Sequence, residues 1–207
     1  MKRIAFITIL LTLICGCPGF SQTVTQAQVK QQISQAASKL KSMQCDFVQT
    51  KHLKMLNDKV VSKGKMYYQQ SDKLRWEYIS PYKYTFILNG SKVQLKNSKR
   101  NDVIDVEKNK LFKEIARIMM SSVVGNCMND KSFKVTISDG KTEWIATMVP
   151  QRKEMKQMFQ TIKLHFNKKN SMVSMVELIE KNGDKTVIEL KNVKTNVSIA
   201  SSIFSVN

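Results

Sequence analysis

Apolar residues recur at helical spacing close to the start of the chain. From residue 29 an apolar residue follows at every third or fourth position: Val29, Ile33, Ala36, Leu40 and Met43. This spacing places the five side chains on one face of an α-helix. Thr25 precedes the segment and can accept a hydrogen bond from a free backbone N–H of the first turn. The pattern therefore predicts a helix of about four turns that begins near Gln26.

From Phe47 onward the apolar period changes to two, which is the period of a strand with one buried face. Leu74, Trp76 and Tyr78, for example, alternate with polar residues, and Pro81 then ends the segment. Ten strands are predicted, at about residues 47–50, 60–69, 74–78, 84–88, 93–95, 133–138, 143–149, 161–167, 172–180 and 185–193. Ile203-Phe204 is a candidate for a further strand at an edge.

Short turns separate most of these strands, which favours an antiparallel sheet that follows the chain order. Asn89 and Gly90 are expected to be the two central residues of one hairpin, both with positive φ. Helical spacing returns over residues 109–124, where the apolar positions are Leu111, Ile115, Ile118, Met119 and Val123. The Met-rich residues 151–159 form either a short helix or a mobile loop. We therefore expect an α+β fold with the helices on one face of the sheet.

Residues 1–21 have the pattern of a signal peptide. Two basic residues precede the uncharged apolar run 4–14, which is shorter than the roughly 20 residues of a membrane-spanning helix. Gly19-Phe20-Ser21 then offers small residues for a cut before Gln22. We expect export and cleavage, leaving a single domain over 22–207. Two alternatives stay open.

In the first alternative the N-terminal segment is retained as an anchor. In the second, Ile14-Cys15-Gly16-Cys17 is cut as a bacterial lipoprotein box, which it resembles, and Cys17 is lipidated. One acyl anchor would tether the protein to a membrane, whereas the cut before Gln22 would leave it untethered.

The chain is strongly basic, with a formal charge of +18 over 207 residues. The predicted signal peptide holds one lysine, one arginine and no acid, so the remaining 186 residues carry +16. The lysines are scattered along the chain without a nucleic-acid motif, which excludes nucleic acid as the expected partner. Such a charge instead favours salt-dependent encounters with anionic lipid or acidic protein surfaces.

No pattern of catalytic or metal-ligating residues is found. His52 and His165 lack metal-ligand spacing, and there is no G-x-S-x-G elbow or glycine-rich phosphate loop. Cys45 and Cys127 do not form a C-x-x-C motif and are either a disulfide or two buried free thiols. We therefore expect no enzyme, catalytic residue, metal or cofactor, and structural or surface roles for both histidines.

Large apolar side chains are abundant in the predicted strands and helices, and methionine is frequent among them. Methionine suits surfaces that accept varied apolar shapes. Two interpretations follow: a pocket for acyl chains under a helical lid, or an ordinary filled core.

Three motifs resemble a known family. Phe47-Val48-Gln49, then Gly64-Lys65-Met66-Tyr67-Tyr68, then Leu74-Arg75-Trp76-Glu77-Tyr78 followed by Pro81 are similar to the motifs of the LolA-type periplasmic outer-membrane lipoprotein carriers, in the same order. The resemblance extends over essentially the whole chain after the predicted signal peptide.

The resemblance implies a fold and a function. The fold is an open, incomplete antiparallel β-barrel of about ten to eleven strands, with a helical lid over a hydrophobic cavity. The function is a monomeric periplasmic carrier of lipoprotein acyl chains, loaded by an inner-membrane lipoprotein-releasing transporter and unloaded at an outer-membrane acceptor or an anionic lipid surface. The alternatives are a membrane-anchored acceptor lipidated at Cys17, a carrier of another amphiphile such as a glycolipid, and an adaptor with a filled core.

For such a fold, the large apolar positions of the strands and of the second helix predict the ligand-binding residues. These are large side chains of the first strands and of the second helix: Phe47, Met66, Tyr68, Leu74, Trp76, Tyr78 and Phe86 on the cavity walls, and Phe112, Ile115 and Met119 on the lid. One position departs from the family, because an Arg-Pro pair thought to hold the lid closed is replaced by Gln70-Ser71. Arg75 is expected to point to the other face of the sheet.

Overall fold

A computed structural model of the protein describes residues 25–108, 110–124 and 126–206. The predicted signal peptide, the alternative lipidation site at Cys17 and Gly125 lie outside these described residues. Within them, no helix is long and apolar enough to cross a membrane.

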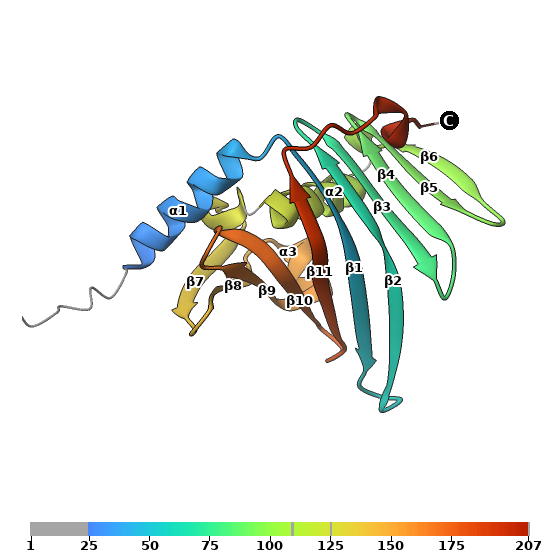
Figure 1. The fold of residues 1–207 in the computed structure, drawn as a ribbon. Helices are drawn as coiled ribbons and strands as arrows, with labels where there is room; N and C mark the ends of the chain where they lie inside the picture. The colour runs from blue at the N-terminus through green and yellow to red at the C-terminus, as the bar shows by residue number, and fades with distance from the viewer. Residues whose placement is uncertain (1–24, 109, 125, 207) are drawn as a thin grey trace, which may run out of the picture.

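One antiparallel sheet of eleven strands forms the body of the protein (Figure 1). The strand order is β6-β5-β4-β3-β2-β1-β11-β10-β9-β8-β7, so two meanders are joined where β1 pairs with β11. Strands β6 and β7 are the two edges, and the sheet stays open between them, as expected for an incomplete barrel. The strands are β1 (Ser42–Leu53), β2 (Asp58–Gln69), β3 (Lys73–Ser80), β4 (Tyr84–Asn89), β5 (Lys92–Asn97), β6 (Asn101–Asp105), β7 (Phe133–Asp139), β8 (Glu143–Pro150), β9 (Phe159–Asn167), β10 (Met172–Glu180) and β11 (Lys185–Thr195).

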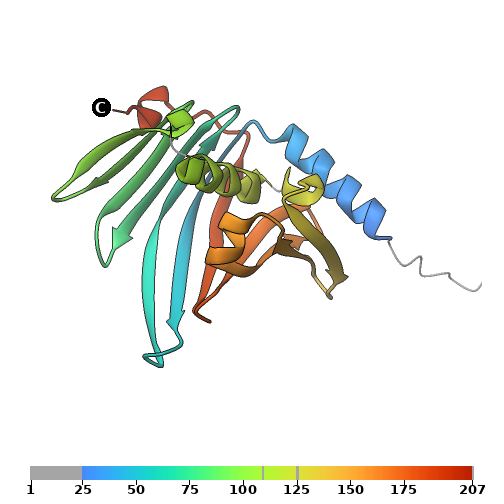
Figure 2. The ribbon, with the colours of Figure 1, turned by 180° about the vertical axis from the view of Figure 1, so that it is seen from behind.

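Helices α2 and α3 lie over the same face of the sheet (Figure 2). The chain between edge strands β6 and β7 crosses the sheet and carries the long helix α2 (Figure 2). Helix α3 occupies the Met-rich segment 151–159, which decides between the two sequence-based alternatives in favour of a short helix. We call α2 and α3 the lid helices. The face of the sheet on which they lie is called the helix-covered face. The helices are α1 (Gln26–Lys39), α2 (Lys110–Val124) and α3 (Lys153–Met158), with 3-10 turns η1 (Val106–Lys108), η2 (Asn126–Asn129) and η3 (Ser201–Phe204).

Helix α1 begins as predicted and has the predicted length of about four turns, but it ends before Met43. Thr25 forms a capping box with Gln28, in which each side chain satisfies a backbone N–H of the other residue. The helix stops at Lys39, because the backbone of Lys41 is tied to other elements: its N–H donates to Asn196 Oδ1 and its carbonyl accepts from Gln70. Met43, predicted on the helix, is therefore a buried residue of β1.

Two further expectations are wrong in detail. The loop between β4 and β5 consists of Gly90 and Ser91, and Gly90 has a φ of 59° while Asn89 is the last residue of β4. Ile203-Phe204 belongs to η3 and is not a strand. Phe204 is fully buried there, and two hydrogen bonds hold the turn: the guanidinium of Arg75 donates to the Ile203 carbonyl and Asn89 Nδ2 donates to the Phe204 carbonyl.

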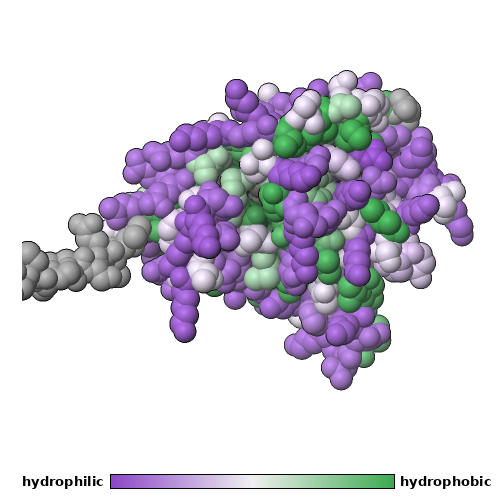
Figure 3. All heavy atoms as spheres, viewed as in Figure 1, coloured by the Kyte–Doolittle hydropathy of each residue, from purple (hydrophilic) through white to green (hydrophobic). Residues whose placement is uncertain are grey.

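Strand β6 has no counterpart in the sequence-based prediction. Its residues are mostly polar and its burial is low throughout, as expected of an edge strand with little apolar alternation. On the face seen in Figure 3, hydrophilic side chains likewise predominate, in agreement with the high lysine content. The main core lies on the opposite, helix-covered face, where the inward residues of both meanders meet.

Candidate functional site

An apolar cavity of about 270 Å³ lies between the helix-covered face and the lid helices. Strands β1, β3, β9, β10 and β11 form its floor, and α2 and α3 its cover. Most of its lining side chains are aliphatic or sulfur-containing: Gln49, Trp76, Tyr78, Ile118, Met119, Met155, Met158, Phe159, Ile162, Val173, Val176, Leu178, Ile188 and Leu190. Such a lining can hold hydrocarbon and offers few hydrogen bonds.

Three aromatic rings in contact with one another support one wall of the cavity. The Phe47 ring lies 4.5 Å from the Trp76 ring and meets the Tyr78 ring edge-on at 5.2 Å, centroid to centroid. Phe47 is fully buried behind the other two. Contacts of this kind are typical of well-packed aromatic pairs and fix the orientation of the wall.

The polar groups of the lining gather at this wall. The Tyr78 hydroxyl donates a hydrogen bond of 2.9 Å to Gln49 Oε1, and burial raises the pKa of the Tyr78 phenol, which therefore stays neutral. The indole N–H of Trp76 is buried close to the Tyr78 hydroxyl and partly offsets the rise of the Tyr78 pKa, but it makes no hydrogen bond of good geometry with the described residues. The Trp76 N–H is therefore available to an acceptor atom of a bound molecule.

A second, open pocket of about 580 Å³ adjoins the cavity. The two spaces share Gln49, Met158, Phe159 and Leu178. Beyond these residues the open pocket is polar and carries both signs of charge, with the residues Lys51, Gln157, Glu180, Lys181, Asn182 and Thr186. We call it the cavity mouth. An amphiphile could place its apolar part in the cavity and its polar part in the mouth.

The structure places the ten predicted site residues in different surroundings. Trp76, Tyr78 and Met119 line the cavity. Phe47, Met66, Leu74 and Phe86 lie on the same face but are core residues, and Tyr68 lines a different pocket. Phe112 and Ile115 belong to α2, and their side chains lie outside the described part of the chain.

Most of the remaining lining comes from the C-terminal strands and α3, which the predicted set did not include. Val173, Val176 and Leu178 of β10 and Ile188 and Leu190 of β11 are apolar residues in strands that were correctly predicted. Their periodicity could have identified them as facing one side of the sheet. It could not distinguish a residue beside a void from one in a filled core.

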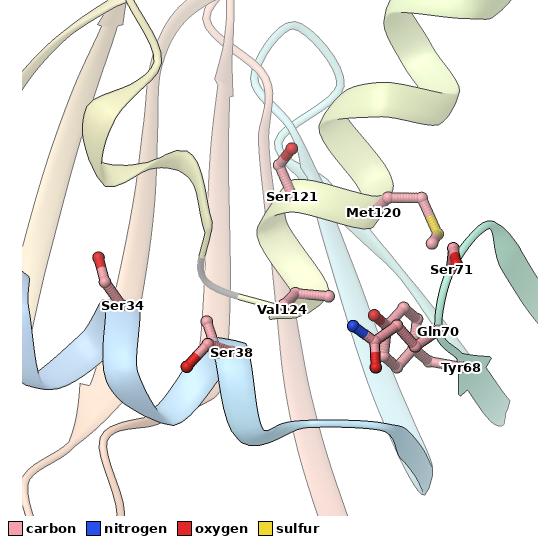
Figure 4. A pocket seen from close by; sticks show the side chains of 9 residues that line it. Ser34, Ser38, Tyr68, Gln70, Ser71, Met120, Ser121 and Val124 are labelled. Atoms are coloured by element: carbon pink, nitrogen blue, oxygen red, sulfur yellow. The ribbon is translucent and has the colours of Figure 1, made fainter.

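Gln70-Ser71, which replaces the Arg-Pro pair of the family, lies beside α2. Figure 4 shows both residues with Tyr68 next to Met120 and Val124 of α2, around a pocket of about 310 Å³ that also includes residues of α1. The exposed Gln70 is thus at the position where a side chain can contact the lid from the sheet. Ser71 is too short to reach far across this space.

A different contact holds the middle of α2. The guanidinium of Arg117 pairs with the Asp130 carboxylate, which also accepts the Ser132 backbone N–H at 2.8 Å. Partial burial would raise the Asp130 pKa, but these hydrogen bonds outweigh it and hold the pKa below its usual value. This ion pair ties the lid to the chain just before β7.

His165 lies away from the cavity. It neighbours Leu164 on β9 and points to the other side of the sheet, between the Oε1 atoms of Glu143 at 3.1 Å and Glu177 at 3.0 Å. Lys185 Nζ lies 2.7 Å from the second oxygen of Glu177. This arrangement supports a structural role. Among the described residues, no three His, Cys, Asp or Glu side chains gather as a metal site.

Cys45 has a buried free thiol on β1. Burial, reinforced by the neighbouring Asp46 carboxylate, raises its pKa from 9.0 to about 12. The side chain of Cys127, the other half of the alternative disulfide, lies outside the described part of the chain.

We expect Cys45 to resist alkylation in the folded protein. At pH 8 a thiol of pKa about 12 is ionised roughly a thousandfold less than an unfolded thiol, and only the thiolate reacts. In a Cys127→Ser variant of the chain that starts at Gln22, labelling of Cys45 by iodoacetamide should therefore require denaturant. Above about pH 9 the thiol ionises in the unfolded chain but not in the folded protein, so its contribution to the free energy of unfolding falls as the pH rises. Rapid labelling without denaturant would contradict the burial of Cys45.

Comparisons with known proteins agree on one family. Residues 38–207 match the family described as "Outer membrane lipoprotein carrier protein LolA". An outer-membrane lipoprotein carrier protein of Methylococcus capsulatus is 26% identical over 201 residues, covering 95% of this chain and 90% of the relative. The protein of that name from Francisella tularensis is 24% identical over 192 residues, covering 93% and 90%.

Solved structures share the fold at low sequence identity. The MucA/MucB complex of Pseudomonas aeruginosa matches with a TM-score of 0.53 and 10% identity, over 87% of this chain and 60% of that chain. The present chain thus spans three fifths of that chain. An uncharacterized conserved protein of Thermus thermophilus matches with a TM-score of 0.53 and 7% identity, over 86% and 91%.

Proposed function

Because this chain belongs to the LolA family of outer membrane lipoprotein carrier proteins, we propose that it binds the acyl chains of lipoproteins and carries them from the inner to the outer membrane. The observation that carries this proposal is the apolar cavity beneath the lid helices. An acyl chain exposed to water costs about 0.8 kcal/mol for each CH2 group, so a shielded space is needed for transfer between membranes.

The polar wall of the cavity supports one orientation of the bound lipid. The N–H of Trp76, which makes no hydrogen bond of good geometry in the empty cavity, can donate to an ester or amide carbonyl, and Gln49 lies at the boundary with the mouth. The acyl chain would then extend toward α3 and β10, and the polar part of the lipoprotein would leave through the mouth.

The size of the cavity supports movement of the lid. About 270 Å³ is just below the roughly 300–1,000 Å³ of ordinary ligand pockets, and a lipoprotein anchor has two or three acyl chains. Loading therefore requires the lid helices to move outward. With Gln70-Ser71 in place of Arg-Pro, no charge-assisted fork contacts the lid from this position.

The proposal includes export to the periplasm after cleavage of residues 1–21, and a single monomeric domain over 22–207. It also includes loading by an inner-membrane lipoprotein-releasing transporter and delivery to an outer-membrane acceptor or an anionic lipid surface. The charge of the mature chain supports encounters that weaken as the ionic strength rises. No catalytic step, metal or cofactor is involved.

Native mass spectrometry of the protein purified gently from an exporting host tests the proposal. We expect a chain that begins at Gln22 and carries lipid-sized adducts, which organic solvent removes. The same chain should then release lipoproteins from inner-membrane vesicles into solution.

Other outcomes of this measurement contradict parts of the proposal. A clean apo mass, with no uptake of an added diacyl lipid, would mean that the cavity does not serve a carrier. A mass that begins at Cys17 with added acyl groups would instead indicate a membrane-anchored acceptor. Glycolipid adducts alone would indicate a carrier of another amphiphile.

A further inference from the structure

The hairpin between β1 and β2 projects beyond the neighbouring strands. The two strands are paired with each other as far as Leu53 and Asp58. The pairing of β2 with β3 stops at Lys63, and the pairing of β1 with β11 stops at His52. Residues 53–62 therefore extend past this part of the sheet, at the lower end of the molecule in Figures 1 and 2. We call them the hairpin tip.

Apolar side chains at the hairpin tip are open to water. Met55 is 92% exposed and Leu56 is 71% exposed, and Val60 and Val61 are partly exposed behind them. In Figure 3 apolar and polar side chains lie side by side over this projecting end. Single exposed apolar residues are normal on protein surfaces, but two adjacent ones at the extremity of a projection indicate a surface that contacts a partner.

Positive charge surrounds these apolar side chains. Lys54 and Lys59 lie within the hairpin tip and Lys63 lies just behind it, whereas Lys51 is paired with Glu180 at 2.8 Å. Asp58 is the one acidic residue between residues 51 and 63. Lysine ammonium groups interact with the phosphates of anionic lipids while apolar neighbours enter the acyl boundary. The composition of the hairpin tip therefore complements an anionic bilayer.

The hairpin tip is held in a defined position. The backbone N–H of Lys54 donates to Asp184 Oδ1 at 3.0 Å, and Asn182 Nδ2 donates to the other oxygen of Asp184, also at 3.0 Å. Asp184 is buried in the turn between β10 and β11. These hydrogen bonds fix the base of the hairpin tip. Binding through Met55 and Leu56 therefore does not require a loose loop to become ordered.

Strand β1 connects the hairpin tip to the candidate lipid site. Gln49 lines both the cavity and its mouth, and Lys51 lines the mouth. At about 3.3 Å per strand residue, Leu53 at the end of β1 lies roughly 13 Å beyond Gln49, and Met55 lies in the turn that follows it. A membrane that meets the tip therefore lies at the same end of the protein as the mouth.

We propose that the hairpin tip is a membrane-docking site, which inserts Met55 and Leu56 into the surface of an anionic bilayer and holds the cavity mouth close to it. This inference rests on the proposed function for its purpose, since a carrier of acyl chains must meet a membrane. The docking site is tested by vesicle binding alone. The cavity is tested separately by the uptake of an apolar fluorescent probe, so the two proposals can fail independently.

The experiment measures cosedimentation of the chain begun at Gln22 with vesicles of phosphatidylcholine and phosphatidylglycerol. We expect salt-sensitive binding to these vesicles and much weaker binding to phosphatidylcholine alone. Replacing both Met55→Ser and Leu56→Ser should weaken binding about tenfold or more, because the inserted apolar area is lost. Probe uptake should be unchanged, since neither residue lines the cavity.

Val103→Ser is the matched control, because Val103 is 49% exposed on β6. It should leave vesicle binding unchanged. The double variant Lys54→Gln with Lys59→Gln should weaken binding and reduce its salt dependence. Equal vesicle binding by the Met55/Leu56 variant and the wild type would overturn the proposal. So would the absence of vesicle binding by the wild type, which would instead favour a protein acceptor as the partner of the tip.

Discussion

The variant Leu178→Asp is expected to take up acyl ligands more than about a hundredfold more weakly than the wild type. Leu178 lines both the cavity and its mouth, so the new carboxylate would lie where an acyl chain passes. Burying a carboxylate against hydrocarbon costs about 3 kcal/mol or more, and each 1.4 kcal/mol is a factor of about ten. Because Leu178 is half-buried, the empty protein can hydrate the new group and keep its fold.

Ile179→Asp is the matched control for this variant. Ile179 follows Leu178 on β10, is also half-buried, and points to the opposite side of the sheet. It does not line the cavity. Titration of an apolar fluorescent probe and of a diacyl lipid should show a loss of binding for Leu178→Asp and wild-type binding for Ile179→Asp. Similar binding by all three proteins would exclude the cavity as the ligand site.

Gly64→Ala is expected to destabilise the protein by about 3 kcal/mol, which lowers the Tm by roughly 6–12 °C for a chain of this size. A Cβ at Gly64 would lie 2.0 Å from the Glu77 carbonyl oxygen and 2.5 Å from the Phe47 ring. The first clash is with the backbone of β3 and cannot be relieved by a change of side-chain rotamer. The second would push Phe47 toward the Trp76 ring of the cavity wall.

Urea denaturation followed by circular dichroism measures this effect. Gly90→Asn is the control, because Gly90 has a positive φ but open space around it, and asparagine tolerates this conformation. Its cost should stay below about 1 kcal/mol. If Gly64→Ala unfolds at the wild-type urea concentration, the close packing of β2 against Phe47 and β3 is wrong.

The strands could be predicted wherever one face is buried. In β3 the burial alternates over residues 73–77 and the apolar residues alternate in step. In β9 His165 is buried as well, but the apolar residues still alternate: Ile162, Leu164 and Phe166. Strand β6 lacks that alternation because it is a polar edge, and η3 was missed because Ile203 and Phe204 are held by hydrogen bonds from distant side chains. Helix α1 has the predicted length of about four turns, but Met43 was wrongly placed on it, since only tertiary contacts of Lys41 show where the helix ends.

The candidate site was less predictable than the fold. Trp76 and Met66 share a face of the sheet, yet Trp76 borders the cavity and Met66 is fully buried in the core. Alternation in the sequence assigns residues to a face of the sheet, but it does not show how the lid helices cover that face. The hairpin tip was also missed, because Met55 and Leu56 look like any short apolar pair until the different lengths of the strand ladders are known.

The position of α2 in the chain has a mechanical consequence. This helix belongs to the segment that leaves one free edge of the sheet at β6 and enters the other at β7. A change in the distance between the two edges therefore also moves the two ends of the segment that carries the helix over the cavity. Flattening of the sheet and displacement of α2 are coupled by the covalent chain, so a bulky cargo that spreads the two meanders would also pull on its own cover.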